Sequence, residues 1–190
     1  FVPYAFELPV GFDETLPALQ IPLKGADTMI MRGIVDRLDI LRRDGKVYVR
    51  VADYKTGSKN FSLEEVLAGH NVQLLLYLFS ICASNGSPFY QKLAPFGEEL
   101  VPAGAVYFSA RPGEASSPVP LDEAAAREEA KQSISRRGII LRDDDVIRAM
   151  DKDVSGRFIP VTKNKDGSYS KHSSLATREE FQEIYRGLIG

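Results

Sequence analysis

Two segments of alternating apolar and polar residues flank a dipeptide that favours a tight turn. Residues 28–41 and 46–56 both have a period of two, and Asp44-Gly45 between them is a strong signal for a two-residue hairpin loop. With that loop, Arg43 faces Lys46 and the apolar residues of the two strands agree in register. The sequence therefore predicts an antiparallel hairpin, whose register would shift if the loop had another length.

The same register places two carboxylates opposite each other. Asp36 then faces Asp53, and both lie on the apolar side of their strands. The residues that share this side are Ile30, Ile34, Asp36, Leu38 and Ile40 on the first strand and Val47, Val49, Val51, Asp53 and Lys55 on the second. Opposed carboxylates have β-carbons about 5 Å apart, and such a pair is destabilising unless a cation or a shared proton compensates it. Since oxygen ligands with few histidines nearby favour Mg²⁺ or Mn²⁺ over Zn²⁺, the pair is a candidate site for one of these cations.

Lys55 lies two residues beyond Asp53 on the same side of its strand, and it has two interpretations. It would hold a water or stabilise negative charge that develops on a phosphate. Alternatively, it only neutralises Asp53 at the strand end, with Asp36 exposed at a rim. The next helical segment favours the first interpretation, because its polar residues fall within one narrow stripe of an otherwise apolar surface: His70, Gln73, Tyr77, Ser80 and Ser84.

The remaining elements are predicted from capping and turn residues. Ser62 to Glu65 is a capping box for a helix that runs to Ser84, and residues 85–100 form a loop. The further elements are a strand over 103–110, surface helices over 121–135 and 144–150, a hairpin around Asp166-Gly167 and a final helix capped by Thr177-x-x-Glu180. This order of elements predicts an α/β (α+β) fold with a central mixed sheet flanked by helices.

Composition restricts the classes of function. The chain has 190 residues, 44% of them hydrophobic, and a net charge of -2, which fits one globular core and argues against a general polyanion binder. The apolar stretch around Leu74 to Cys82 is too short to cross a bilayer, so no membrane role is expected. The single cysteine, Cys82, excludes an internal disulfide and fits a reducing compartment, so the cytoplasm is the expected location.

Two charged stretches have a simple alternative to a functional role. Residues 42–59 carry six cationic side chains against two acids, which is enough to attract a phosphate backbone but also typical of a solvated hairpin. Asp143-Asp144-Asp145 lies at a predicted helix N-terminus, where the helix dipole alone accounts for acidic residues.

Three motifs in a fixed order resemble a known family. Gly33-Ile-Val-Asp36-Arg-Leu-Asp39, Asp53-Tyr-Lys55-Thr-Gly57 and Gln73-x-x-x-Tyr77 resemble the RecB-like branch of the PD-(D/E)xK nuclease superfamily. The chain is also similar to the C-terminal nuclease domains of AddB proteins, which belong to bacterial AddAB (RexAB) helicase-nucleases, through residues 102–108 and 138–150. The resemblance implies a restriction-endonuclease-like core over about residues 1–112 and a family-specific elaboration over about 113–190, together one nuclease domain of a larger chain.

The resemblance also implies a role for each motif residue. Asp36 and Asp53 would bind the metal, with the Tyr54 backbone carbonyl completing the coordination, and Lys55 would be the catalytic lysine. Gln73 and Tyr77 would position the DNA strand. Three further residues match less specific parts of the pattern: Glu7 as an acidic residue near the start of the domain, and Arg37 with Asp39 as either a phosphate contact or a fold-stabilising ion pair.

The implied function is a Mg²⁺-dependent (or Mn²⁺-dependent) exonuclease that degrades DNA strands unwound by an ATP-dependent helicase-nuclease during recombinational repair of double-strand ends. Its partners would be single-stranded DNA, digested in the 5′ to 3′ direction, and an AddA-like subunit. The family's upstream histidine and the cysteines of a 4Fe-4S cluster would lie outside this segment, so the isolated segment would be inactive if it needs them. The alternatives are a catalytically inactive nuclease-like scaffold that binds DNA ends or a partner, and a structural domain with a surface ion-pair network.

Overall fold

The computed structural model describes residues 1–13, 15–22, 27–55, 72–109 and 136–189. Several predicted features lie outside these residues. They are the capping box at Ser62 to Glu65, His70 and the helix over 121–135.

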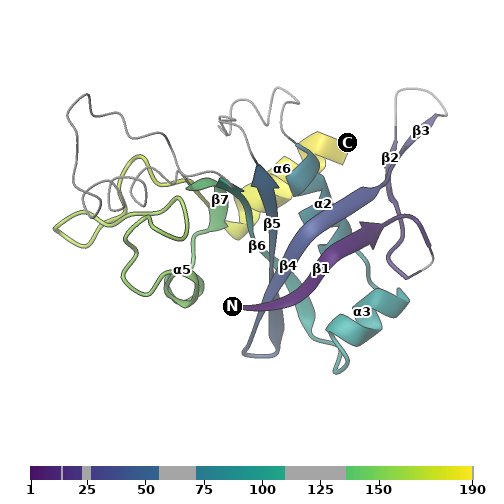
Figure 1. The fold of residues 1–190 in the computed structure, drawn as a ribbon, viewed down its shortest axis with the longest axis horizontal. Helices are drawn as coiled ribbons and strands as arrows, with labels where there is room; N and C mark the ends of the chain where they lie inside the picture. The colour runs from purple at the N-terminus through teal and green to yellow at the C-terminus, as the bar shows by residue number, and fades with distance from the viewer. Residues whose placement is uncertain (14, 23–26, 56–71, 110–135, 190) are drawn as a thin grey trace, which may run out of the picture.

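A six-stranded mixed sheet forms the centre of the molecule (Figure 1). Its strands run in the order β1 (Val2–Val10), β4 (Gly33–Arg43), β5 (Lys46–Lys55), β6 (Glu99–Ser109), β7 (Arg136–Leu141) and β8 (Leu175–Ala176). The β5/β6 and β7/β8 pairs are parallel, and the other three pairs are antiparallel. Strands β2 (Leu19–Pro22) and β3 (Thr28–Met31) form a separate antiparallel pair. The predicted fold class, an α/β fold with a central mixed sheet flanked by helices, is confirmed.

The hairpin between β4 and β5 has the predicted register. Arg43 pairs with Lys46, and the pairing continues through Leu38 with Val51 to Arg37 with Ala52. Asp44 and Gly45 have φ angles of 51° and 69°, as a tight turn that matches the twist of the two strands requires.

The prediction of one continuous strand over residues 28–41 is wrong. β3 ends at Met31 and pairs with β2, and β4 begins at Gly33, so the chain leaves one sheet and enters the other between them. Ile30 and Ile34, predicted on the core side, are 55% and 53% exposed. The alternation of apolar residues did not predict burial here, because each of the two strands has its own partners and its own buried side.

Helices and loops cover both faces of the sheet (Figure 1). α2 (Gln73–Cys82) packs against β5, β6 and α6 (Arg178–Ile189), in the cluster that includes the inward valines of β5. Alternate residues of β6 and β7 point the other way and form a second cluster with α5 (Asp144–Met150) and the segment after it.

Capping and turn residues correctly predicted several of the shorter elements. The Thr177 box is present at the start of α6, since Thr177 N donates to Glu180 Oε2 at 2.7 Å and Glu180 N donates to Thr177 Oγ1 at 3.2 Å. The predicted helix over 144–150 is confirmed, and the chain around Asp166-Gly167 makes an antiparallel bridge between Lys163 and Tyr169.

Residues 85–100 are not a plain loop, as they were predicted to be. They contain the helix α3 (Pro88–Leu93), which begins after the N-cap Ser87 with a proline at its first position, and the start of β6 at Glu99. β7 was not predicted. No helix in the described ranges is both long and apolar enough to cross a membrane.

A buried ion network lies on the sheet face away from α2. Asp39 is fully buried; its Oδ2 accepts hydrogen bonds from Arg50 Nη2 at 2.6 Å and Nε at 3.1 Å, and its Oδ1 accepts one from Arg37 Nε at 2.7 Å. The two arginines satisfy both carboxylate oxygens, so the charges compensate one another inside the sheet.

This network predicts a large stability effect. Asp39→Ala should lower the free energy of unfolding by about 3–5 kcal/mol, because it leaves the buried Arg50 guanidinium without its carboxylate. The control is Glu99→Ala, which removes contacts to the more exposed Lys46 and Arg178 and should cost less than about 1 kcal/mol. Urea unfolding of the three proteins measures both values, and equal losses for the two variants would contradict the prediction.

Candidate active site

The two predicted metal carboxylates lie side by side at one rim of the sheet. The β4–β5 pairing ends at Arg37 and Ala52, and Asp36 and Asp53 are the next residues on their strands. Asp36 Oδ2 accepts a hydrogen bond of 2.9 Å from the backbone N–H of Tyr54. The Asp36 side chain therefore reaches across to β5, directly beside the position of Asp53.

Lys55 pairs with Asp53 in this structure. Its Nζ donates to Asp53 Oδ1 at 3.0 Å, and the two side chains are 34% and 20% exposed. The predicted neutralising role is thus present, and partial exposure leaves both groups accessible to a small ion or a substrate phosphate.

The two oxygens of Asp53 both lie close to the Lys55 ammonium. Asp53 Oδ2 is buried and accepts no hydrogen bond from any described residue, although Lys55 Nζ lies 2.8 Å away as an ion-pair contact. The ammonium at this distance compensates the charge of the oxygen, so Lys55 contacts both oxygens of Asp53. Two neighbouring carboxylates form an oxygen donor set that fits a hard divalent cation.

Tyr54, Arg37 and Asp39 lie on the opposite side of the strands from Asp53. The Tyr54 side chain is exposed and packs against Phe108 with ring centroids 5.7 Å apart, and its hydroxyl accepts a hydrogen bond from Arg37 Nη1 at 3.2 Å. Since Arg37 also donates to the buried Asp39, its geometry is that of the predicted fold-stabilising ion pair rather than of a phosphate contact beside Asp53.

Gln73 and Tyr77 lie on the first turns of α2, and Tyr77 contacts the start of β4. Gln73 Nε2 donates to Tyr77 Oη at 2.8 Å, and Tyr77 is buried while Gln73 is exposed. A β-carbon at Gly33 would lie only 1.7 Å from Tyr77 Oη, so the tyrosine hydroxyl rests directly on the start of β4. The close approach explains why the motif that contains Asp36 begins with a glycine.

The other polar residues of the predicted helix stripe do not extend this group. Ser80 and Ser84 are buried, and Ser84 Oγ donates to the Ile81 carbonyl oxygen at 2.7 Å. Only the first turns of α2 therefore bring polar groups of the stripe to the rim.

Glu7 lies near the site but apart from the two aspartates. It falls between the pairs Phe6–Arg37 and Leu8–Val35, which places its backbone opposite Asp36, and it is exposed with a φ of 49°. Among the described residues, no three His, Cys, Asp or Glu side chains gather closely enough to hold a metal together.

The sequence did not predict Tyr107 as a neighbour of Asp53. It pairs with Asp53 in the parallel β5/β6 ladder and lies on the same side of the sheet. Burial and the nearby Asp53 carboxylate raise the pKa of Tyr107 to about 12, so its hydroxyl stays protonated. No turn signal fixes the register of two strands joined by a long crossover, which is why the sequence did not indicate this neighbour.

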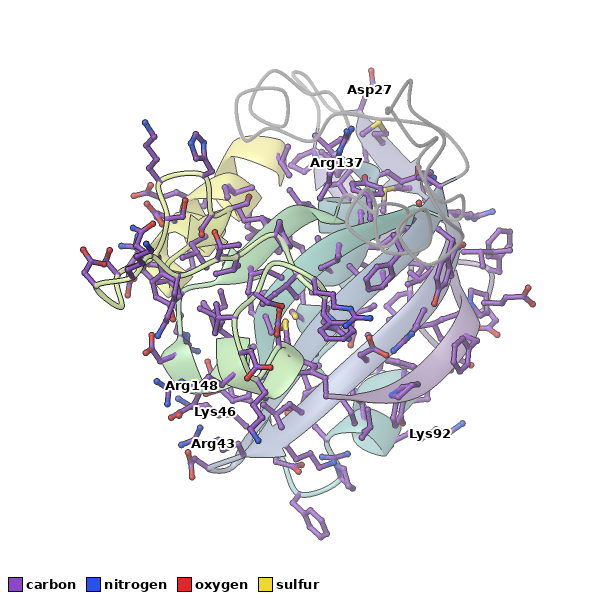
Figure 2. All side chains as sticks on the ribbon, turned by 60° about the vertical axis from the view of Figure 1, so that its left-hand side comes forward. Asp27, Arg43, Lys46, Lys92, Arg137 and Arg148 are labelled. Carbon is purple, nitrogen blue, oxygen red and sulfur yellow. The ribbon has the colours of Figure 1, made fainter. Side chains whose placement is uncertain are left out.

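The basic stretch over 42–59 is largely neutralised. Within the described part of it, each cation has an acidic partner: Arg42 with Glu98, Arg43 with Asp44 and Asp145, Lys46 with Glu99, Arg50 with Asp39, and Lys55 with Asp53. Figure 2 shows Arg43 and Lys46 at the turn end of the hairpin, far from the rim. The structural interpretation of this stretch is therefore favoured.

The acidic run at 143–145 caps a helix, as predicted. Asp143 accepts hydrogen bonds from the N–H groups of Asp145 and Val146, both at 3.0 Å. Asp144 and Asp145 make ion pairs with Lys163 and Arg43.

Several known proteins have sequences similar to that of this chain. The profile of a family described as the PD-(D/E)XK nuclease superfamily matches residues 1–180. A protein of Alkaliphilus oremlandii, named as the B subunit of an ATP-dependent helicase/deoxyribonuclease, is 32% identical over 196 aligned positions, which cover 100% of this chain and 16% of that protein. The proteins with the same name from Clostridium acetobutylicum and Caldanaerobacter subterraneus are 32% and 34% identical, again over 100% of this chain and 16% of each relative. The chain thus spans about a sixth of the length of these relatives.

The contact between Gly33 and Tyr77 yields a testable prediction. Gly33→Ala should lower the free energy of unfolding by about 1–3 kcal/mol, because the new methyl group displaces the Tyr77 ring. The loss should be smaller in a Tyr77→Phe background, where the closest atom is gone. Gly187→Ala is the control, since a β-carbon there meets no atom within 4 Å and alanine favours the helix. Chemical denaturation measures all four variants, and additive losses at Gly33 and Tyr77 would contradict the contact.

Proposed function

This chain belongs to the PD-(D/E)XK nuclease superfamily, and we propose on this basis that it is a metal-dependent deoxyribonuclease domain that hydrolyses phosphodiester bonds of single-stranded DNA. The observation that carries the proposal is the group at the sheet rim, where Asp36 and Asp53 lie beside each other and Lys55 contacts Asp53. A purely structural ion pair would not need the second carboxylate.

Asp36 and Asp53 are the residues that would hold Mg²⁺ or Mn²⁺, with the backbone carbonyl of Tyr54 as a further oxygen ligand. When bound, the ion would neutralise charge on the phosphodiester and lower the pKa of a water for attack. The hydrogen bond from the Tyr54 N–H fixes one oxygen of Asp36 and orients the carboxylate.

Lys55 is the catalytic lysine in this proposal. In hydrolysis, a bond forms between the water oxygen and phosphorus, one ester P–O bond breaks, and the leaving oxygen ends protonated. The Lys55 ammonium lies beside Asp53 and supplies a positive charge where negative charge develops on the phosphate oxygens. Its partial exposure lets it exchange its contact with Asp53 for one with substrate.

Gln73 and Tyr77 position the strand. Their mutual hydrogen bond and the contact of Tyr77 with Gly33 hold the Gln73 amide over the start of β4, the strand that carries Asp36. An exposed amide fixed in this way can contact a sugar or a phosphate without selecting a base sequence. This property suits an enzyme that degrades DNA of any sequence.

We further propose that the domain works as an exonuclease within an ATP-dependent helicase-nuclease that processes double-strand ends for recombinational repair. The names of the relatives, each the B subunit of a helicase/deoxyribonuclease, support this context, and their greater length leaves room for the other activities. An AddA-like subunit would be the partner, and the bacterial cytoplasm the location. The core over residues 1–112 would carry the chemistry and residues 113–190 the family-specific part, with any 4Fe-4S cysteines elsewhere in the larger chain.

The first test compares two substitutions on one hairpin. In the full-length protein with its partner subunit, Asp53→Asn should lower Mg²⁺-dependent degradation of the strand assigned to this domain by about a hundredfold or more, because it removes a metal ligand. Asp44→Asn, at the turn end of the same hairpin, should retain activity, since asparagine also accepts the positive φ of that position. Release of labelled nucleotides measures both rates. Equal activity in the two variants would reject the nuclease assignment and favour the scaffold alternative.

Metal binding can be tested without catalysis. At about a hundredfold excess over its Kd, Mg²⁺ or Mn²⁺ should stabilise the folded protein by about 2.7 kcal/mol, which raises the Tm by about 5 °C or more. The shift should be absent in Asp53→Asn and present in Asp44→Asn. Thermal denaturation with and without the cation gives the result, and an equal shift in both variants would place the ion elsewhere.

A further inference from the structure

A row of side chains continues from the candidate metal carboxylates across the sheet. Asp53 on β5 pairs with Tyr107 on β6, and Tyr107 pairs with Arg137 on β7. Residues paired in this way project from the same face of a sheet. Carboxylate, hydroxyl and guanidinium groups therefore follow one another along the rim.

Alternation along the paired strands indicates which face this is, and the buried neighbours of the row agree with it. Ala105 and Ile139, which pair one step further from the rim, are buried in the cluster with α2, whereas Val106 and Ile140 are buried in the cluster with α5. Since alternate residues share a face, Tyr107 and Arg137 lie on the α2 side, together with Asp53 and Lys55.

The row extends about two strand spacings from the carboxylates and ends in a cation. Neighbouring strands lie about 4.8 Å apart, so the backbones of Asp53 and Arg137 are roughly 10 Å apart, with Tyr107 on the strand between them. Tyr107 offers a neutral hydroxyl donor, and Arg137 offers a permanent positive charge with several donors in one plane. Figure 2 shows Arg137 at the end of the sheet away from Arg43, Lys46 and Arg148.

We propose that Arg137 and Tyr107 form a second phosphate subsite, which binds a backbone phosphate next to the one hydrolysed at Asp36 and Asp53. The inference rests on the proposed nuclease function and adds the path of the strand, which runs along the rim from β5 toward β7. Arg137 supplies the charge that binds this phosphate, and the Tyr107 hydroxyl donates a second hydrogen bond. Because both contacts go to the backbone, the subsite raises affinity without selecting sequence.

The test uses the full-length protein with its partner subunit and a single-stranded oligonucleotide that carries one uncharged methylphosphonate linkage, placed at successive positions beside the bond to be cleaved. Arg137→Gln should raise KM for the unmodified strand about tenfold, with kcat within about twofold of wild type, since a charge-assisted hydrogen bond is lost. The slope of log kcat/KM against log salt concentration should become shallower by about the amount that corresponds to one phosphate contact. Tyr107→Phe, which removes one hydroxyl, should raise KM about threefold.

The modified linkages decide whether the contact is direct. At one position, the methylphosphonate should weaken the wild type but have no further effect on Arg137→Gln, because the charge it removes is the partner of that arginine. Arg148→Gln, on the exposed surface of α5, is the matched control and should behave as wild type at every position. The subsite is rejected if both Arg137→Gln and Tyr107→Phe keep the wild-type KM, or if every methylphosphonate penalty is equal in wild type and Arg137→Gln.

Failure of the nuclease proposal gives a different result. In that case the wild type shows no cleavage that depends on Asp53, and the same oligonucleotides are titrated by fluorescence anisotropy in EDTA. Weaker binding by Arg137→Gln with a position-specific methylphosphonate effect would then support the phosphate subsite on a non-cleaving protein. Equal binding by wild type and Arg137→Gln would reject it.

Discussion

The register of the β4–β5 hairpin is the constraint on which the site and the core both depend. Because side chains alternate between the faces, a slip of one residue would move every side chain of one strand to the other side. With the observed register, Asp39 contacts Arg50 on one face of the sheet. Asp36 and Asp53 lie next to each other just beyond the last pair of the ladder. A two-residue turn with two positive φ angles holds both arrangements at once.

Asp39 and Asp53 are both charged residues of the sheet, but their environments differ. The carboxylate of Asp39 is fully buried, and two arginines hydrogen-bond to both of its oxygens, so it is not accessible to a ligand. Asp53 is partly exposed, and the single side chain that contacts both of its oxygens is a flexible lysine. The first environment favours stability and the second favours exchange of partners, as expected where a site must bind and release ions and substrate.

The sequence predicted those parts of the structure that short-range rules determine. Turn chemistry set the hairpin register, and the Thr177 box located the start of α6. Alternation alone failed at Ile30 and Ile34, because burial there depends on which sheet each strand joins. Tyr107 and the contact between Gly33 and Tyr77 were beyond prediction for the same reason, since both arise from elements that meet only after a long crossover.

The parallel pairing of β5 with β6 has a consequence for how the site forms during folding. The hairpin closes a loop of two residues, whereas β6 must return after α2 and α3, so its pairing carries a much larger loop-closure entropy and a higher contact order. Contact order therefore predicts that Asp36 and Asp53 come together, in a local structure, before Tyr107 and Arg137 join them.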